Sequence, residues 1–207
     1  MPSGVNTYGS MLHVAAVTEY VNPPTEATVT DVFSNKWRML GRRKDNASGC
    51  SISLWYCENP TNSALGASTH TLTVSGSGIY PTVAFYSFSG TDPAAPLCET
   101  ELLGQSASGT SATFSYTPGI GGLIIAAGVL GVSSGLPVVT GLLSPLSALD
   151  VTNVPIWAGY QIQSSPSALS IGVSWPSAST TTGMAALFRL PVSGGGGFGP
   201  IGEGLVY

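Results

Sequence analysis

Two histidines, His13 and His70, are among the few side chains in this sequence that could exchange protons near neutral pH. His13 lies in an apolar run, and His70 shares one face of an alternating segment with Leu72 and Val74, so both are predicted to be core or edge residues. No Cys-x-x-Cys or His-x-x-x-His spacing accompanies them, which argues against a zinc site. We therefore expect no catalytic residue, no metal and no cofactor.

Glu99 and Glu101 are the acidic pair whose spacing could do chemistry, because residues two apart share one face of a strand. Paired carboxylates could cleave a glycosidic bond, or could bind a cation together with Asp92. The neighbouring Pro93 and Pro96 favour a solvated loop edge instead. We favour this structural interpretation and expect the protein not to be an enzyme.

The cations are concentrated in one place, because five of the six basic residues lie between Lys36 and Lys44. A charged edge strand that blocks sheet-to-sheet aggregation is the favoured interpretation. The alternative is a contact with an acidic partner through Arg42, Arg43 and Lys44. The net charge of -4 argues against nucleic acid as a partner.

The aromatic and sulfur-containing residues are also given a structural interpretation. Four tryptophans, Trp37, Trp55, Trp157 and Trp175, could form a platform that stacks on sugars, but their places in alternating strands favour core packing. Cys50 and Cys57 are seven residues apart and would lie roughly 23 Å apart on one strand, too far for a disulfide. Together with Cys98 they are expected to be buried thiols.

The composition indicates a subunit of an assembly. Apolar residues make up 43% of the 207 residues, whereas charged residues make up only 8%, against about 25% in a typical soluble domain. So little charge suits a surface that partners cover. The longest apolar stretch, Leu123–Val132, is about half of the roughly 20 residues that a membrane helix needs, so we expect no membrane contact.

Period-two alternation predicts that β-strands position these residues. Thr69–Ser75, Ser111–Thr117 and Ala168–Trp175 each alternate apolar with polar side chains, which is typical of strands with one face in a core. Ser34-Asn35 is a candidate two-residue hairpin turn, and Leu142–Val151 could hold one helical turn, limited by Pro145. Runs that are apolar on both faces are predicted to be central or covered strands: Met11–Tyr20, Ile52–Cys57, Val83–Phe88, Leu123–Leu130 and Gly183–Leu190.

The segments recur in the same order in two halves of the chain, at offsets of about 98 to 112 residues. Met11–Tyr20 resembles Leu123–Leu130, and Val83–Phe88 resembles Met184–Phe188. The segments around Trp55 and Trp157 match in the same way, as do Thr71–Val74 and Leu169–Val173. The prediction is an all-β, antiparallel, two-sheet sandwich that is jelly-roll-like, with about ten to twelve strands.

The domain prediction is an N-terminal arm over residues 1–10, a β-sandwich over 11–192 and a glycine-rich C-terminal arm over 193–207. A glycine-rich segment buries too little to order itself, so something must hold the arm. The body of the same chain could do so, but we favour a neighbouring subunit. The predicted interface residues of the arm are Phe198, Ile201, Leu205, Val206 and Tyr207.

Several motifs resemble a β-sandwich module of tailed-phage virion proteins and related prophage or bacterial surface proteins. Asp31–Trp37 is similar to its D-x-x-G-N-x-W turn, although Ser34 stands where a glycine is usual. Ser53–Tyr56, Thr69–Val74 and Val83–Gly90 are similar to its x-L-W-Y, x-H-T-x-T-V and x-A-x-x-x-F-S-G strands. The resemblance spans roughly residues 11–190, implies a jelly-roll-like sandwich in a virion and carries no catalytic residue.

The function we expect is therefore structural. The chain would be a capsid decoration or a minor capsid or tail-associated subunit of a bacteriophage. It would be made in the host cytoplasm, located in the virion, and held there by contacts with other virion proteins and with further copies of itself. The alternative is a β-sandwich adhesion module that binds a receptor or a host surface glycan.

Overall fold

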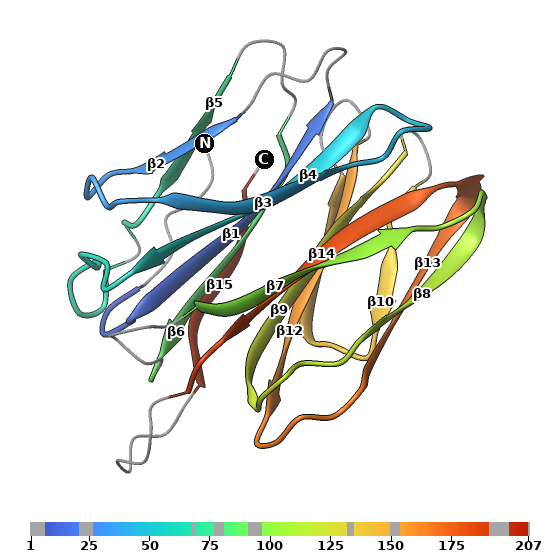
Figure 1. Cartoon of the computed structure of the whole chain (residues 1–207). Coiled ribbons are helices and arrows are strands. Elements are labelled where there is room, and N and C mark those ends of the chain that lie inside the picture. Colours follow the sequence, from blue (N-terminus) through green and yellow to red (C-terminus); the bar gives the residue numbers. More distant parts are fainter. Residues whose placement is uncertain are drawn as a thin grey trace.

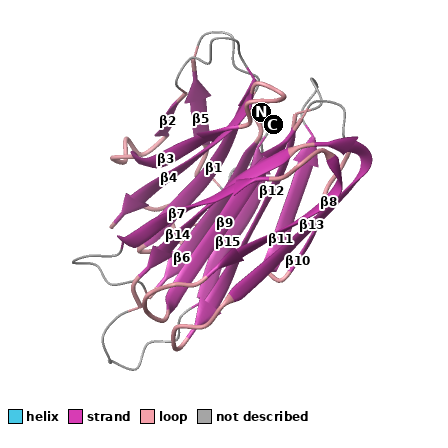
Figure 2. Ribbon diagram, turned by 45° about the vertical axis from the view of Figure 1, so that its right-hand side comes forward, coloured by secondary structure: helices cyan, strands magenta, loops and turns pink. Residues whose placement is uncertain are grey.

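The computed structural model describes residues 7–20, 27–67, 69–76, 81–90, 97–131, 135–149, 154–190 and 199–206. These residues form fifteen β-strands and no helix, and every strand pair is antiparallel (Figure 1; Figure 2). The all-β antiparallel prediction is confirmed, with more strands than the ten to twelve expected. In chain order the strands are β1 Leu12–Tyr20, β2 Thr28–Asp31, β3 Arg38–Lys44, β4 Cys50–Glu58, β5 Leu72–Ser75, β6 Val83–Ser89, β7 Leu97–Gln105, β8 Gly109–Tyr116, β9 Gly122–Leu130, β10 Val138–Thr140, β11 Leu143–Leu149, β12 Pro155–Gln163, β13 Leu169–Ser179, β14 Thr181–Phe188 and β15 Gly199–Val206.

The strands form four sheets. Two five-stranded sheets, ordered β15-β6-β1-β4-β3 and β11-β12-β9-β14-β7, face each other and make the sandwich. The pair β2-β5 covers the outer face of the first large sheet, and the three-stranded sheet β10-β13-β8 covers the outer face of the second. The molecule is thus a sandwich with a smaller covering sheet on each side.

This layering explains why several strands are apolar on both faces. In β1, Leu12 and Val14 point into the central core, whereas Ala15 and Val17 point toward the covering pair β2-β5. All nine residues of β9 are buried. A strand buried on both faces is mostly apolar, because each fully buried aliphatic side chain contributes about 1.5 to 3 kcal/mol relative to exposure. The prediction of covered strands is confirmed.

The strands of the covering sheets alternate apolar with polar residues, because only their inner faces are buried. In β13, Leu169, Ile171 and Val173 are buried against the second large sheet, whereas Ser170 and Ser174 face outward. The side chains that are buried set the register, since a slip by one residue would turn every apolar side chain outward.

The two predicted halves are present as a topological repeat. Strands β3-β4-β1-β6 of the first half occur in the same order as β11-β12-β9-β14 of the second half. The fifth position of each large sheet is taken by a strand from the other half. β7 follows β14, and β15 follows β6, as the dark red strand beside the green one in Figure 1.

Two local expectations were wrong. The turn at Ser34-Asn35 does not join a hairpin, because β2 pairs with β5 while β3 pairs with β4, so the chain changes sheets there. Leu143–Leu149 is strand β11, with a bulge that absorbs Pro145. The backbone of 199–206 forms β15, which pairs with β6 of the same chain, and the prediction that the arm contacts a neighbouring subunit stays a prediction.

Candidate functional site

The turn after β2 is organised around one carboxylate. Asp31 Oδ1 accepts hydrogen bonds from the backbone N–H groups of Phe33 and Asn35, both at 3.0 Å. Its Oδ2 accepts from Asn35 Nδ2 at 2.9 Å and from Trp37 Nε1 at 2.8 Å. Within the Asp31–Trp37 motif, Asp31 therefore accepts the hydrogen bonds that hold the turn, and Asn35 and Trp37 donate them. This bonding explains their spacing.

The imidazole of His70 continues this network inward. His70 Nε2 lies 3.2 Å from Asp31 Oδ2, and Nδ1 lies 2.9 Å from Thr7 Oγ1. Since a carboxylate only accepts, Nε2 carries the proton. Thr7 is itself fixed by Ser63, which accepts from the Thr7 N–H at 2.7 Å and donates its own N–H to Thr7 Oγ1 at 3.0 Å.

His13 lies against His70 but is held in the neutral form. Its ring meets that of His70 edge to face at 4.7 Å, and Phe85 and Trp37 pack around it. Burial, reinforced by His70, lowers the pKa of His13 to about 3. Ser87 Oγ lies 3.1 Å from Nδ1, and no partner for Nε2 is found among the described residues.

Burial also opposes ionisation of Asp31. The hydrogen bonds from His70, from the Asn35 backbone and from Trp37 outweigh it and hold the pKa of Asp31 well below its usual range. The network therefore contains a stable carboxylate at Asp31, and His13 beside it is a neutral imidazole.

The order Thr7–His70–Asp31 is that of a hydroxyl, an imidazole and a carboxylate, as in a nucleophilic triad. However, Thr7 is fully buried and His70 is 2% exposed, so the hydroxyl does not face solvent. The network ties β1, β2 and the segment before β5 together, and the prediction that both histidines are core residues is confirmed. Thr7 lies within the predicted N-terminal arm, residues 1–10, where no local pattern in the sequence marks it.

The sequence also contains a spacing that is typical of a catalytic serine. Gly131–Gly135 reads Gly-x-Ser-x-Gly, the spacing of a nucleophile elbow. Its middle residues, 132–134, lie outside the described residues. The described strand that follows is β10, whereas the elbow requires a helix at that place.

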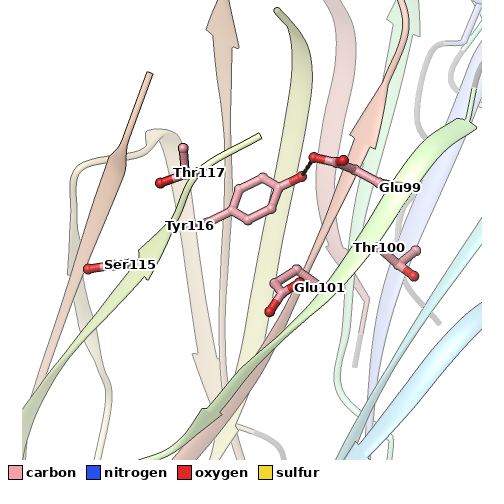
Figure 3. A pocket seen from close by; sticks show the side chains of 6 residues that line it. All are labelled: Glu99, Thr100, Glu101, Ser115, Tyr116 and Thr117. Atoms are coloured by element: carbon pink, nitrogen blue, oxygen red, sulfur yellow. Dashed lines mark hydrogen bonds between the residues drawn. The ribbon is translucent and has the colours of Figure 1, made fainter. Parts of the chain in front are cut away.

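The acidic pair lies at an open cleft of about 260 Å³ between β7 and the end of β8 (Figure 3). Glu99 and Glu101 share a face of β7, as their spacing predicts. Glu99 Oε1 accepts from the Tyr116 hydroxyl and from the Gly119 N–H, the latter at 3.0 Å. Glu101 is exposed, and Asp92 lies outside the described residues. No group of three metal-ligating side chains is found in the described part of the chain.

Four of the five clustered basic residues lie on β3, which is an edge strand as predicted, and Lys36 precedes it. Arg42 forms an ion pair with the buried Glu19 and donates from Nε to Ser51 Oγ at 3.3 Å. Arg43 Nε donates to Thr182 Oγ1 of the opposing sheet at 3.3 Å, and Lys44 ends the strand half-buried. Arg42 and Arg43 thus have structural roles in this chain, and the prediction that they contact a partner stays a prediction.

The tryptophans are core residues rather than a platform. Trp157 and Trp175 are buried, and Trp37 and Trp55 are half-buried against the covering pair β2-β5. Trp157 stacks on Phe114 at 5.5 Å and donates from Nε1 to Thr181 Oγ1 at 3.0 Å.

The described cysteine side chains are buried, as expected. Cys50 and Cys57 lie on one strand, and Cys57 is a free thiol. Burial, followed by the charges of Asp31 and Glu58, raises the pKa of Cys57 to about 11, which leaves it unreactive at neutral pH. The side chain of Cys98 lies outside the described residues.

The outer face of β10-β13-β8 is uncharged. A shallow groove of about 160 Å³ runs across it. The polar residues of this face are serines and threonines: Ser111, Thr113, Ser115, Thr140, Ser170 and Ser174. The face carries no charge because no charged residue lies between Asp150 and Arg189 or between Glu101 and Asp150.

Of the predicted arm residues, Ile201, Leu205 and Val206 lie in β15. Phe198 and Tyr207 lie outside the described residues. Within the described ranges no helix is long and apolar enough to cross a membrane. Comparisons with known protein families, with curated proteins and with solved structures find no match to this chain.

Proposed function

We propose that this protein is a structural subunit of a bacteriophage virion, as a capsid decoration or as a minor capsid or tail-associated protein. The observation that carries the proposal is the uncharged outer face of β10-β13-β8, which is built from short hydroxyl side chains and shallow enough to accept a flat neighbour. Such side chains lose little conformational entropy when they are covered, and no charge has to be desolvated.

The sequence motifs give the second line of support. The resemblance to virion sandwich modules includes Asp31, Asn35 and Trp37, and these residues form the hydrogen-bonded turn at which the chain changes sheets. They belong to the framework of the fold, so the resemblance bears on architecture and reaches function only as a proposal.

The proposal is tested on particles purified from lysates of cells that carry the gene. We expect mass spectrometry to detect the chain in banded particles at a fixed ratio to the main capsid protein. The paired variants Ser170→Lys and Thr73→Lys then compare a charge on the uncharged face with a charge on exposed β5. Occupancy should fall with Ser170→Lys and persist with Thr73→Lys. Absence of the chain from the particles, or equal occupancy of both variants, would overturn the proposal.

A further inference from the structure

Each large sheet of this protein is completed by a strand from the other half of the chain. β7 belongs to the first half but pairs with β14, and β15 belongs to the second half but pairs with β6. Accepting a strand from another folding unit is therefore part of the architecture, and it occurs twice.

β7 is fixed by side chains as well as by its ladder. Gln105 Nε2 donates to Asp45 Oδ1 at 2.6 Å, Thr182 Oγ1 donates to the Gly104 carbonyl at 2.6 Å, and Glu99 bonds to Tyr116. Its chain continues directly into β8, so β7 is tethered at both ends.

The backbone of β15 pairs with β6 along the edge of the first large sheet, and the strand also passes beside β11. Its eight residues include three glycines and one proline, which are weak strand formers, and its register shifts between Pro200 and Gly202. The sequence that leads into it contains Gly194–Gly197, a run that places few steric restrictions on the path of the backbone.

The edge that β15 covers must always be covered. Val83, Phe85 and Tyr86 of β6 are buried, so a bare β6 edge would expose unpaired backbone groups beside an apolar core. The β15 strand of a second copy presents the same sequence and would make the same ladder. Exchange between copies therefore changes few contacts, and the local concentration decides which β15 occupies the edge.

We propose that β15 is an exchangeable strand and that copies of this chain join by inserting β15 of one copy beside β6 of another. The partner is a second copy of the chain. Strand exchange would join copies within the proposed virion, and only this location rests on the proposed function.

The test uses the purified full-length chain and two single substitutions, Ser89→Cys and Gly199→Cys, each combined with Cys98→Ser. Ser89 and Gly199 are Cα partners in the β6–β15 ladder, a separation at which a disulfide can form. The double variant Ser89→Cys/Gly199→Cys should close within one chain in dilute solution. A concentrated mixture of the two single variants should give a disulfide-linked dimer that reductant dissolves.

The matched control is a mixture of Ser89→Cys with Ser170→Cys, whose cysteine lies on the exposed face of β13 and measures random collisions. We expect the dimer fraction of the β6–β15 mixture to exceed this control several-fold and to rise with concentration. Dimer at the control level, while the double variant closes normally, would overturn the exchange and leave the virion proposal standing. Failure of the double variant to close would also overturn it, because β15 would then not occupy the β6 edge.

Discussion

The two halves of this protein share one topology but close their outer interfaces with different chemistry. In the first half, the space between β1 and the covering pair β2-β5 holds a polar network of Asp31, His70 and His13. In the second half, the space between β12 and the covering sheet holds Trp157 stacked on Phe114. The same strand order is thus compatible with either polar or apolar side chains between a large sheet and its covering strands.

The difference shows that strand pairing and alternation define the fold. The side chains packed within each interface define how its stability depends on pH and on side-chain volume. An apolar interface gains stability in proportion to its buried area and does not titrate. A buried polar network is stable only while each donor and acceptor keeps its partner. The first half should therefore be sensitive to pH, and the second half to loss of side-chain volume.

The largest expected effect is from Trp157→Ala. Its ring is fully buried, and an added Cβ at Gly128 or Gly183 would come within 3 Å of it, so the site is closely packed around the indole. We expect a loss of about 4 kcal/mol in the free energy of unfolding, measured by denaturant titration.

The matched change in the first half is Trp55→Ala. Trp55 is half-buried and donates from Nε1 to Ser53 Oγ at 3.0 Å, so its removal should cost only about 1.5 kcal/mol. Equal losses for the two variants would contradict the claim that the second half depends more on packed volume.

The next effect is a fall in stability as pH decreases below about 6.5. His13 has a folded pKa of about 3, so below its ordinary pKa of 6.5 the unfolded chain binds a proton that the folded chain cannot. Stability should therefore drop by up to about 1.4 kcal/mol per pH unit below pH 6.5, which amounts to about 3 kcal/mol at pH 4. The depressed pKa of Asp31 acts in the same direction, because its stabilisation is present above the ordinary pKa of Asp and is lost as pH falls below it.

His13→Gln is the control for this slope, since glutamine can bond to Ser87 without titrating. Urea titrations at pH 7, 6, 5 and 4 should show a shallower fall for the variant than for the parent chain. Parallel slopes would mean that His13 does not control the response.

Much of the fold could be predicted from the sequence because strands buried on one face alternate visibly. β8, β13 and the buried strands β1, β6 and β9 were all located, and so was the order of the two halves. What local pattern could not show was which strands pair. The turn at Ser34-Asn35 resembled a hairpin, yet strand pairing across the whole chain places β2 and β3 in different sheets. The placement of β7 beside β14 and of β15 beside β6 likewise depends on sheet edges that are far away in the sequence.

The polar network was predicted less well. The sequence marked Asp31, Asn35 and Trp37 as one motif, and both histidines as core residues, but did not connect them. Their connection needs Thr7, which lies 63 residues before His70 and is brought to it by the packing of β1. Hydrogen bonds between residues this distant leave no periodic signal in a single sequence.

The smallest expected effect on stability comes from substitutions in the turns that follow the covering strands β2 and β10. The chain leaves β2 through Ser34, at φ 57°, and leaves β10 through Gly141, at φ 82°. Ser34 is exposed, so Ser34→Gly removes the steric cost of the left-handed conformation and leaves only the extra entropy of glycine in the unfolded chain. We expect a net gain of about 0.5 to 1 kcal/mol in thermal or denaturant unfolding. Gly141→Ala should have the opposite sign, because a Cβ there would lie 2.1 Å from the Ser170 carbonyl oxygen. A destabilised Ser34→Gly variant would show that the serine side chain, and not the backbone of the turn, contributes to the first half.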